Sequence, residues 1–588
     1  FKSIFMIIQT KLPILLWLVL LGAVLLSCKK DEKNSLTVSP TTIQIPAEGG
    51  VEAISIKTNA SSWSISNSAD WVTLSQSSGT TAEALINFAV STKTVTDREA
   101  KLTIKAGDAN EIIVVVKQAA SDYLYALSSD VTTLGFSVSG NTLSFKVSTT
   151  AESWSIQDSI SWLSFSTKQG VKGETTVSLT SSANSGQNAR QATFVIKADY
   201  APAVTITVNQ NGELYPNYNT NPIPADETGM ESTAGELANK INIGWNIGNT
   251  LEAIGGETAW GNPMVSTALI DLVKQSGFNA IRIPCSFNQY MENSSTAKIK
   301  ESWLNRVKTV VQYCVERDMY VLLNIHWDGG WLENNITTQK QEANNAKQKA
   351  FWQQIATHLR DFDEHLMFAS ANEPNVDNAT QMAVLTSYHQ TFIDAVRSTG
   401  GKNAYRVLVV QGPSTDIEKT NQLMKTLLVD VIANKMMVEV HYYTPWNFCG
   451  LAEDASWGKM FYYWGNGYHS VNDPERNATW GEESTVNTNF GLMRAQFVQK
   501  GIPVLLGEYS AMRRSALTGL QLSEHLASRA YYHYYITKKA KENGILPFYW
   551  DNGGMDNNAC GIFNRLNNTV FDQQTLDALM QGANGRKK

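Results

Sequence analysis

Cysteine is scarce in this chain of 588 residues, which contains five. No two of them form a C-x-x-C pair, and none stands near histidines with the spacing of a zinc site. The sequence therefore implies no metal and no other cofactor. Four cysteines stand in the C-terminal half, and the sequence leaves open whether they pair or remain buried thiols: Cys285, Cys314, Cys449 and Cys560.

Charged residues are also few, at 17%, and the chain has no basic tract. Its formal net charge is −6, which argues against the basic surface that nucleic acid attracts, so we expect no nucleic-acid partner. Aromatic residues are plentiful, with 16 Trp and 21 Tyr. Flat rings without basic charge suit a neutral polymer such as a polysaccharide, although core rings contribute to this number.

Long hydrophobic runs are absent except at residues 12–26, and that run is shorter than a membrane-spanning helix requires. It follows Lys11 and ends in Leu25-Leu26-Ser27-Cys28, which resembles the lipobox of bacterial lipoproteins. The charged residues 29–32 resemble the export tag of Bacteroidetes surface lipoproteins. We therefore expect residues 1–28 to be a lipoprotein signal peptide, with Cys28 acylated and the protein anchored at the cell surface in the outer membrane. An ordinary cleaved signal peptide with a coincidental cysteine is the alternative.

Residues 35–212 contain an internal repeat. Trp63-Ser64-Ile65-Ser66 returns as Trp154-Ser155-Ile156-Gln157, and Arg98 and Gln118 correspond to Arg190 and Gln210. Both copies alternate apolar with polar residues and break at Gly or Asn, which predicts short strands. We expect two all-β immunoglobulin-like sandwiches, at residues 35–120 and 121–212.

The two copies resemble the BACON domain, which is found beside carbohydrate enzymes of Bacteroidetes. Trp63 and Trp154 fall in the alternating frame and can be core rings. We favour a spacer role for both domains, with glycan binding as the alternative.

A linker is predicted at residues 213–230, because this stretch carries Pro216, Pro222 and Pro224 and no apolar periodicity. Proline favours an extended, semi-rigid connection.

From residue 231 to residue 588 the pattern changes to alternating strands and helices. Apolar runs predict strands at residues 243–247, 280–284, 320–325, 366–371, 406–411, 436–441, 503–507 and 546–550. Helical spacing predicts helices at residues 264–276, 303–316, 346–359, 382–397 and 522–541. Eight strands alternating with helices predict an α/β fold, a (β/α)8 TIM barrel.

Two glutamates follow the ends of such strands, Glu373 in Asn372-Glu373-Pro374 and Glu508 in Gly507-Glu508-Tyr509. The chemistry of a (β/α)8 barrel is built at the carboxyl ends of its strands. Two carboxylates at that edge are what glycoside hydrolysis requires, one to protonate the leaving oxygen and one to attack or to activate water.

The strand ends carry further polar and aromatic residues: Arg282, His326, Asn372, His441, Tyr443 and Trp550. This constellation resembles glycoside hydrolase family 5 over residues 240–565. By that resemblance Glu373 is the acid/base and Glu508 the nucleophile of a retaining reaction. The nucleophile must stay ionised, and Arg282 and Tyr443 can supply donors. The acid needs a raised pKa.

The resemblance assigns further roles around the sugar. Asn372 would bind the 2-hydroxyl, Trp550 would form the floor, and the two histidines would bind or orient hydroxyl groups. Candidate stacking platforms are Trp260, Trp327, Trp331 and Trp446. Trp327 stands where many members of the family carry a second histidine, which affects substrate identity more than reaction type.

The residues around Trp245 and Trp260 look most like the endoglucanase branches of the family. We therefore expect a monomeric, retaining endo-β-1,4-glucanase that hydrolyses cellulose-type or mixed-linkage β-glucans. A β-mannanase or a xyloglucanase of the same family is the nearest alternative. A non-catalytic glycan-capture lipoprotein and an adhesin that acts through its sandwiches are alternatives of a different kind.

Overall fold

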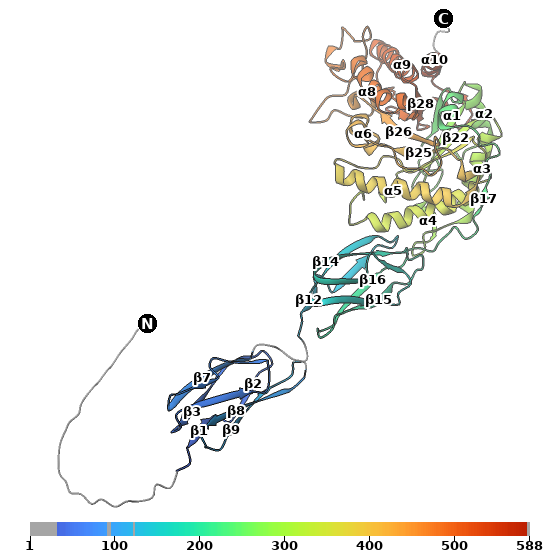
Figure 1. Cartoon of the computed structure of the whole chain (residues 1–588). Coiled ribbons are helices and arrows are strands. Elements are labelled where there is room, and N and C mark those ends of the chain that lie inside the picture. Colours follow the sequence, from blue (N-terminus) through green and yellow to red (C-terminus); the bar gives the residue numbers. More distant parts are fainter. Residues whose placement is uncertain (1–31, 91–95, 122–123, 585–588) are drawn as a thin grey trace, which may run out of the picture. The chain divides into compact units, whose positions relative to one another are not determined.

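The computed structural model describes residues 32–90, 96–121 and 124–584 (Figure 1). The predicted signal peptide, with Cys28, lies outside these residues. Within them, no helix combines the length and the apolar composition that crossing a membrane requires. The chain divides into two compact units, of which the first ends at Asn209 and the second contains everything from Gln210 onward together with Ala183–Arg190.

The first sandwich consists of two sheets around one apolar core. One sheet has the order β1 (Leu36–Ser39), β3 (Gly50–Thr58), β7 (Glu83–Val90), β5 (Val72–Leu74). The other has the order β2 (Thr42–Ile45), β9 (Ile112–Gln118), β8 (Arg98–Ala106), β4 (Trp63–Asn67), β6 (Ser78–Gly79). Alternate residues of these strands are buried, as the alternating sequence predicts.

The second sandwich repeats this plan with longer strands. Its strands are β10 (Leu127–Ser129), β11 (Thr133–Phe136), β12 (Thr142–Gln157), β13 (Leu163–Phe165), β14 (Gln169–Ser181), β15 (Arg190–Lys197) and β16 (Val204–Gln210). Strand β12 spans the positions of β3 and β4 of the first copy, with a register shift between Thr149 and Ser153.

The same contacts recur in both copies, which confirms that the sequence repeat is a structural one. Arg98 Nε donates to Gln118 Oε1 at 2.8 Å, and Arg190 Nε donates to Gln210 Oε1 at 2.8 Å. Trp63 and Trp154 are each 2% exposed. Each indole packs on a glycine of the paired strand, where a Cβ would come within 2.4 or 2.5 Å of the ring. Neither ring is therefore available to stack on a glycan.

The predicted linker is extended, but pairing rather than proline fixes its position. Strand β17 (Ile223–Ala225) pairs in parallel with β24 (Gly400–Gly401) of the barrel domain. The Tyr218 hydroxyl donates to the Thr296 carbonyl at 2.8 Å, and Lys349 Nζ lies 2.6 Å from Glu213 Oε1. The segment after Gln210 thus belongs to the second unit and is not a free connection.

The barrel closes through eight parallel strands. They are β18 (Gly244–Ile247), β19 (Ala280–Cys285), β22 (Tyr320–Ile325), β23 (Leu366–Ala369), β25 (Leu408–Gln411), β26 (Met436–Tyr442), β27 (Val504–Tyr509) and β28 (Ile545–Asp551). Nearly every residue of these strands is buried, as expected for strands covered on both faces. The predicted fold class is confirmed.

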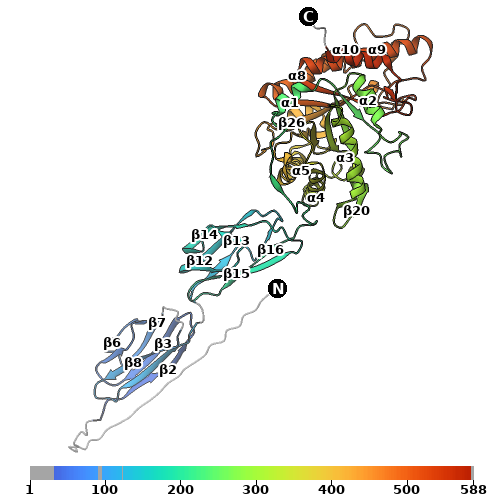
Figure 2. The same cartoon turned by 90° about the vertical axis from the view of Figure 1, so that its right-hand side faces the viewer.

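Helices follow the strands and surround the barrel (Figure 2). They are α2 (Thr267–Gln275), α3 (Glu301–Val315), α4 (Gln341–Leu359), α5 (Ala379–Ser398), α6 (Ile417–Leu423), α8 (Glu483–Gln496), α9 (Gly519–Glu542) and α10 (Gln573–Asn584). Helices α4 and α5 lie side by side in both views. Before the first strand, α1 (Ala234–Lys240) starts at a capping box of Thr233 and Glu236.

Helix α1 packs at the amino-terminal ends of the strands. Its Leu237 joins a cluster with side chains of several strands, among them Leu322, Met367 and Phe548. Asn279, just before β19, donates to the Lys240 carbonyl at 2.8 Å. This end of the barrel is therefore closed by apolar packing, and the opposite end is left for chemistry.

The four cysteines of the barrel domain, Cys285, Cys314, Cys449 and Cys560, are buried free thiols. Burial raises the pKa of each, so these thiols stay neutral and behave as small apolar side chains.

Candidate active site

The eight side chains predicted at the strand ends lie at one end of the barrel. Arg282 belongs to β19, His441 to β26, Glu508 to β27 and Trp550 to β28, while His326 follows β22, Asn372 and Glu373 follow β23, and Tyr443 follows β26. The register pairs His441 with Glu508 on neighbouring strands, so their side chains point to the same side of the sheet.

Glu508 is held by donors on both carboxylate oxygens. Arg282 Nη1 donates to Oε1 at 2.7 Å, and the Tyr443 hydroxyl donates to Oε2 at 2.9 Å. The residue is only 5% exposed, so these charge-assisted bonds act in a poorly solvated site. The arrangement stabilises an ionised carboxylate.

Arg282 connects Glu508 with the segment that carries Glu373. Its Nη1 also donates to Asn246 Oδ1 at 3.0 Å, and its Nη2 donates to Asn372 Oδ1 at 2.9 Å. The guanidinium is fully buried, yet the surrounding carboxylates raise its pKa despite that burial. A fixed positive charge therefore stands at the centre of the site.

Glu373 has a different environment. Its side chain is 45% exposed, and Oε1 lies 2.7 Å from His441 Nδ1. His441 is buried, its Nδ1 is also 3.8 Å from Glu508 Oε2, and its Nε2 is 3.1 Å from Glu439 Oε1. A carboxylate oxygen of Glu373 and one of Glu508 lie within 4.8 Å of each other.

The protonation of this group follows from its charges. Burial lowers the pKa of His441, but the charge of Glu508 and the hydrogen bonds to Glu373 and Glu439 raise that pKa to about 9. The ring is therefore an imidazolium at neutral pH and donates from both nitrogens. Burial acts to raise the pKa of Glu373, and the hydrogen bond from His441 outweighs it and lowers that pKa.

The prediction of a raised pKa for Glu373 is wrong, because the sequence did not reveal His441 as its charged partner. The pKa of Glu508 lies above its usual value, because burial outweighs the charges of His441 and Arg282, which act to lower it. Glu373, His441 and Glu508 are close enough to titrate together.

His326 is a neutral ring beside this group. Burial and the positive charges of Arg282 and His441 lower its pKa well below the usual value. The His326 and Trp550 rings are stacked, with centroids 5.8 Å apart and an angle of 6° between their planes. His326 therefore fixes the orientation of Trp550.

Three of the four predicted stacking platforms are open to solvent. Trp260 is 47% exposed, Trp327 is 45% exposed and Trp446 is 47% exposed. The prediction that Trp331 is the fourth stacking platform is wrong. This residue is buried, its indole nitrogen donates to Asp328 Oδ2 at 3.2 Å, and its ring meets Phe351 edge-on, so it is a core residue and not a stacking surface.

Sequence reasoning missed two buried polar residues behind the site, Glu439 and Gln411. Gln411 Nε2 donates to Glu439 Oε2 at 2.6 Å, and Gln411 Oε1 accepts from the Ala371 amide at 2.9 Å. The signal was a glutamate between Val438 and Val440, because a charge inside a buried strand requires a partner.

A metal ion is not favoured by this arrangement, although Glu373, His441 and Glu508 are close together. Both ring nitrogens of His441 already have carboxylate partners, and the Arg282 guanidinium occupies Glu508. Two cationic side chains at the centre fit a hydrogen-bonded network with a neutral ligand better than a cation site.

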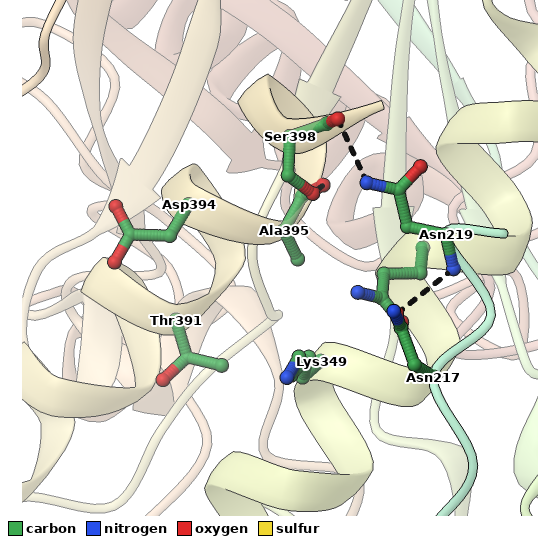
Figure 3. Close-up of a pocket in the computed structure, with 8 residues that line it drawn as sticks. Asn217, Asn219, Lys349, Thr391, Asp394, Ala395 and Ser398 are labelled. Carbon is green, nitrogen blue, oxygen red and sulfur yellow. Dashed lines mark hydrogen bonds between the residues drawn. The ribbon is translucent and has the colours of Figure 1, made fainter. Parts of the chain in front are cut away.

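A hollow of about 410 Å³ lies between the 213–230 segment and helices α4 and α5 (Figure 3). Asn219 closes one side, where its Nδ2 donates to the Ser398 carbonyl at 2.8 Å. Lys349, Thr391 and Asp394 line the rest. None of these residues comes from a strand end, so the hollow is separate from the candidate site.

Comparison with known families identifies both parts of the chain. The model of the cellulases, glycosyl hydrolase family 5, matches residues 246–556, which contain all eight barrel strands from Asn246 to Asp551 apart from two residues of the first. The chain belongs to glycosyl hydrolase family 5. It is therefore a glycoside hydrolase. The BACON domain model matches residues 61–119 and 152–211, in the two sandwiches.

Relatives within the family are similar over most of the chain. A xyloglucan-specific endo-β-1,4-glucanase of Bacteroides ovatus, BoGH5A, is 34% identical over 468 residues, which cover 77% of this chain and 90% of the relative.

Two solved structures extend the comparison. A Bacteroides ovatus family 5 xyloglucanase in complex with a XXXG heptasaccharide is 31% identical with a TM-score of 0.59, covering 79% of this chain and 100% of that one. A broad-specificity endoglucanase of Ruminococcus champanellensis with bound cellotriose is 32% identical with a TM-score of 0.51, covering 60% and 99%.

Proposed function

We propose that this chain is a retaining endo-β-1,4-glucanase in which Glu508 is the nucleophile and Glu373 the acid/base. The observation that carries the proposal is the separation of the two carboxylates, whose oxygens lie within 4.8 Å. Retaining enzymes hold the two carboxyl groups about 5–5.5 Å apart, and inverting enzymes about 6.5–9.5 Å apart. An oxygen-to-oxygen distance within 4.8 Å lies on the retaining side of this division and supports direct attack by the second carboxylate.

The different surroundings of the two glutamates support the assignment of roles. Glu508 is buried and bound by Arg282 and Tyr443, so it is a fixed anion that can attack the anomeric carbon. Glu373 is half exposed and shares a hydrogen bond with a protonated histidine, so it can exchange a proton with the glycosidic oxygen and with water.

The reaction follows in two steps. Glu508 attacks the anomeric carbon while Glu373 passes to the leaving oxygen a proton that it receives through its hydrogen bond with His441, which gives a glycosyl ester on Glu508. The ester carries no charge, so one of the negative charges around His441 is lost in this step. Glu373 then takes a proton from water, the water oxygen displaces Glu508, and the β-configuration is restored.

Asn372 is placed to assist this reaction. Its Oδ1 accepts from Arg282 at 2.9 Å, which leaves the amide nitrogen as the donor for the sugar 2-hydroxyl. A hydrogen bond to that hydroxyl strengthens in the transition state. Trp550, stacked on His326, offers its ring as the floor of the site.

The proposed polymer backbone is a β-1,4-glucan, and two kinds of polymer with this backbone are candidate substrates. Cellulose-type or mixed-linkage glucans fit a broad-specificity endoglucanase such as the Ruminococcus relative. Xyloglucan is the second candidate, favoured by the specificity of BoGH5A, whose similarity extends over more of this chain.

Product analysis of the full chain on a panel tests this proposal. The panel contains carboxymethylcellulose, barley β-glucan, xyloglucan, glucomannan, galactomannan and xylan. We expect short oligosaccharides from barley β-glucan or xyloglucan and none from galactomannan, with the new reducing ends formed first as β-anomers. Cleavage of galactomannan alone would show that the substrate is a mannan and not a glucan. Products formed first as α-anomers would contradict the retaining mechanism.

We further propose that residues 1–28 direct export and that a lipid on Cys28 anchors the protein to the outer membrane at the cell surface. The support is the order of an apolar run, a small residue and a cysteine. A monomeric state stays a prediction.

A further inference from the structure

Glu439 lies in the middle of β26 with its carboxylate fully buried behind the site. We propose that Glu439 is a positioning residue that fixes the Arg282 guanidinium and the His441 ring and retains the proton shared by His441 and Glu373. This inference rests on the proposed roles of Glu373 and Glu508. Glu439 itself does not touch the sugar.

The contacts of Glu439 reach both halves of the site. Its Oε1 lies 2.9 Å from Arg282 Nε and 3.1 Å from His441 Nε2. Arg282 in turn binds Glu508, and His441 in turn binds Glu373. One buried carboxylate thus pairs by charge with Arg282 and by a hydrogen bond with His441, the partners of the two proposed catalytic glutamates.

Glu439 is itself held from two sides. Gln411 binds its Oε2, and the other end of the same amide accepts from the Ala371 backbone, two residues before Glu373. On the neighbouring strand, a Cβ at position 507 would lie 2.0 Å from Glu439 Oε1. Gly507 therefore makes the space that the carboxylate occupies, directly before Glu508.

The charges around His441 explain why this carboxylate matters for the proton. The titratable and charged groups that face His441 come from β19, the end of β22, the segment after β23, β26 and β27: Arg282, His326, Glu373, Glu439, Tyr443 and Glu508. Arg282 is a positive charge that pairs with the same Glu439 oxygen as His441, and His326 is neutral. During turnover Glu508 becomes an uncharged ester and Glu373 gains and loses a proton. Glu439 is the one carboxylate among these described neighbours whose charge stays constant through the cycle.

Glu439→Gln tests the inference, because it removes the charge and keeps the shape. Asp572→Asn is the matched control, since Asp572 is also a buried carboxylate paired with a buried arginine, Arg529 at 2.6 Å, away from the strand-end cluster. The measurement is the pH profile of kcat/KM of the full chain on the glucan that it cleaves best.

The expected result is a shift of the alkaline limb of Glu439→Gln to lower pH by about one unit, which reduces activity at alkaline pH about tenfold relative to activity near pH 6. Asp572→Asn should be less stable than the wild type, but its kcat/KM should decline at the same alkaline pH. A uniform loss of activity at every pH in Glu439→Gln, with the limb unmoved, would show a merely structural role and overturn the inference.

A second measurement tests the same inference without enzyme activity, in case Glu439→Gln folds poorly. The ring signals of the eight histidines can be followed by NMR in protein with ¹³C-labelled histidine, with His441 assigned by its absence in His441→Gln. We expect His441 to titrate at lower pH in Glu439→Gln, and less so in Glu439→Asp, which keeps the charge at a greater distance. An unchanged His441 titration in both variants would also overturn the inference.

The outcome is separable from the proposed function. If Glu508→Gln is inactive and azide rescues Glu373→Ala while Glu439→Gln keeps the wild-type limb, only the role of Glu439 is wrong. If Glu508→Gln retains activity, the proposed function itself fails.

Discussion

Both carboxylate oxygens of Glu508 accept hydrogen bonds from other parts of the barrel, from Arg282 in β19 and from Tyr443 directly after β26. Glu508→Gln keeps the size of the side chain and removes the nucleophile, so turnover should fall by several orders of magnitude while polymer binding persists. Initial rates and affinity gel electrophoresis on the same polymer check this expectation. A variant with near-normal rates would show that the nucleophile is another residue.

Glu373 is the exposed member of the pair, and its removal opens space beside the anomeric carbon. Glu373→Ala should slow hydrolysis of unactivated polymer by about 100- to 10,000-fold, the usual contribution of a general acid. An aryl β-cellobioside with a good leaving group should suffer less in its first step. Azide should restore its turnover and yield a β-glycosyl azide. Absence of rescue, with the variant folded, would remove the acid/base role from Glu373.

His441 makes the stability of the barrel depend on pH. Its pKa in the folded protein, about 9, lies above the ordinary value of 6.5, so its contribution is complete below about pH 6.5 and is lost as the pH rises toward 9. The loss amounts to about 3 kcal/mol, because each pKa unit corresponds to about 1.4 kcal/mol.

Calorimetry of the barrel transition at several pH values checks this expectation, with His441→Gln as the comparison. The variant should lack this part of the alkaline decline, while His365, whose pKa Asp363 also raises, contributes equally to both proteins. Parallel declines in the two proteins would show that His441 is not charged in the folded state.

At the scale of elements, the segment from residue 213 to 230 depends on a glycine for its contact with the barrel domain. Gly400 has a φ of +72°, and a Cβ there would lie 1.8 Å from the Ile223 carbonyl oxygen in β17. Gly400→Ala should therefore cost more than the roughly 1 kcal/mol that a left-handed conformation costs alone, and it should release β17.

Gly501→Ala is the matched control, because Gly501 has a φ of +81° and nothing within 4 Å of the added atom. Limited proteolysis should cut the 213–230 segment faster in Gly400→Ala than in Gly501→Ala. Equal rates of cleavage in the two variants would show that the β17–β24 pairing does not hold the segment.

The eight barrel strands could be predicted from the sequence because each is a short apolar run with a polar residue at its end. Helix α8 was missed, since its buried face consists of Val486, Asn489, Phe490 and Met493 and carries a weak apolar period. Glu439 was missed for a different reason. Its partners, Arg282 and Gln411, come from distant strands that only the closed barrel brings together.

In the candidate site, too, some features could be predicted from the local sequence and others depend on contacts made in the closed barrel. The strand-end position of Glu373 and Glu508 is a local property of the sequence, whereas the charge state of His441 depends on three carboxylates from three segments. Trp331 was wrongly predicted to be a stacking platform, because the solvent exposure of a side chain cannot be inferred from an aromatic motif alone.

At the scale of the whole molecule, the sandwiches show no tryptophan platform in their described residues. Trp63 and Trp154 are core residues, the Arg98 guanidinium lies 4.2 Å from the centre of the Trp71 ring, and Trp162 packs against the core of the second sandwich. We therefore favour the spacer role over glycan binding for both BACON domains.

Cys28→Ser tests the proposed anchor. The variant should appear outside the membrane fraction and incorporate no labelled fatty acid, because the acylated residue is gone. Cys285→Ser serves as the control for loss of a cysteine. Incorporation of label into Cys28→Ser would disprove the lipid attachment at Cys28.

The central claim is a covalent intermediate on Glu508, and a trapping experiment tests it most directly. The full chain is incubated with a 2-deoxy-2-fluoro-β-cellobiosyl fluoride, and its peptides are analysed by mass spectrometry. We predict one glycosyl group on the peptide that contains Glu508, with no label in Glu508→Gln. A label on the Glu373 peptide instead, or hydrolysis of polymer by inversion with no label at all, would contradict the account.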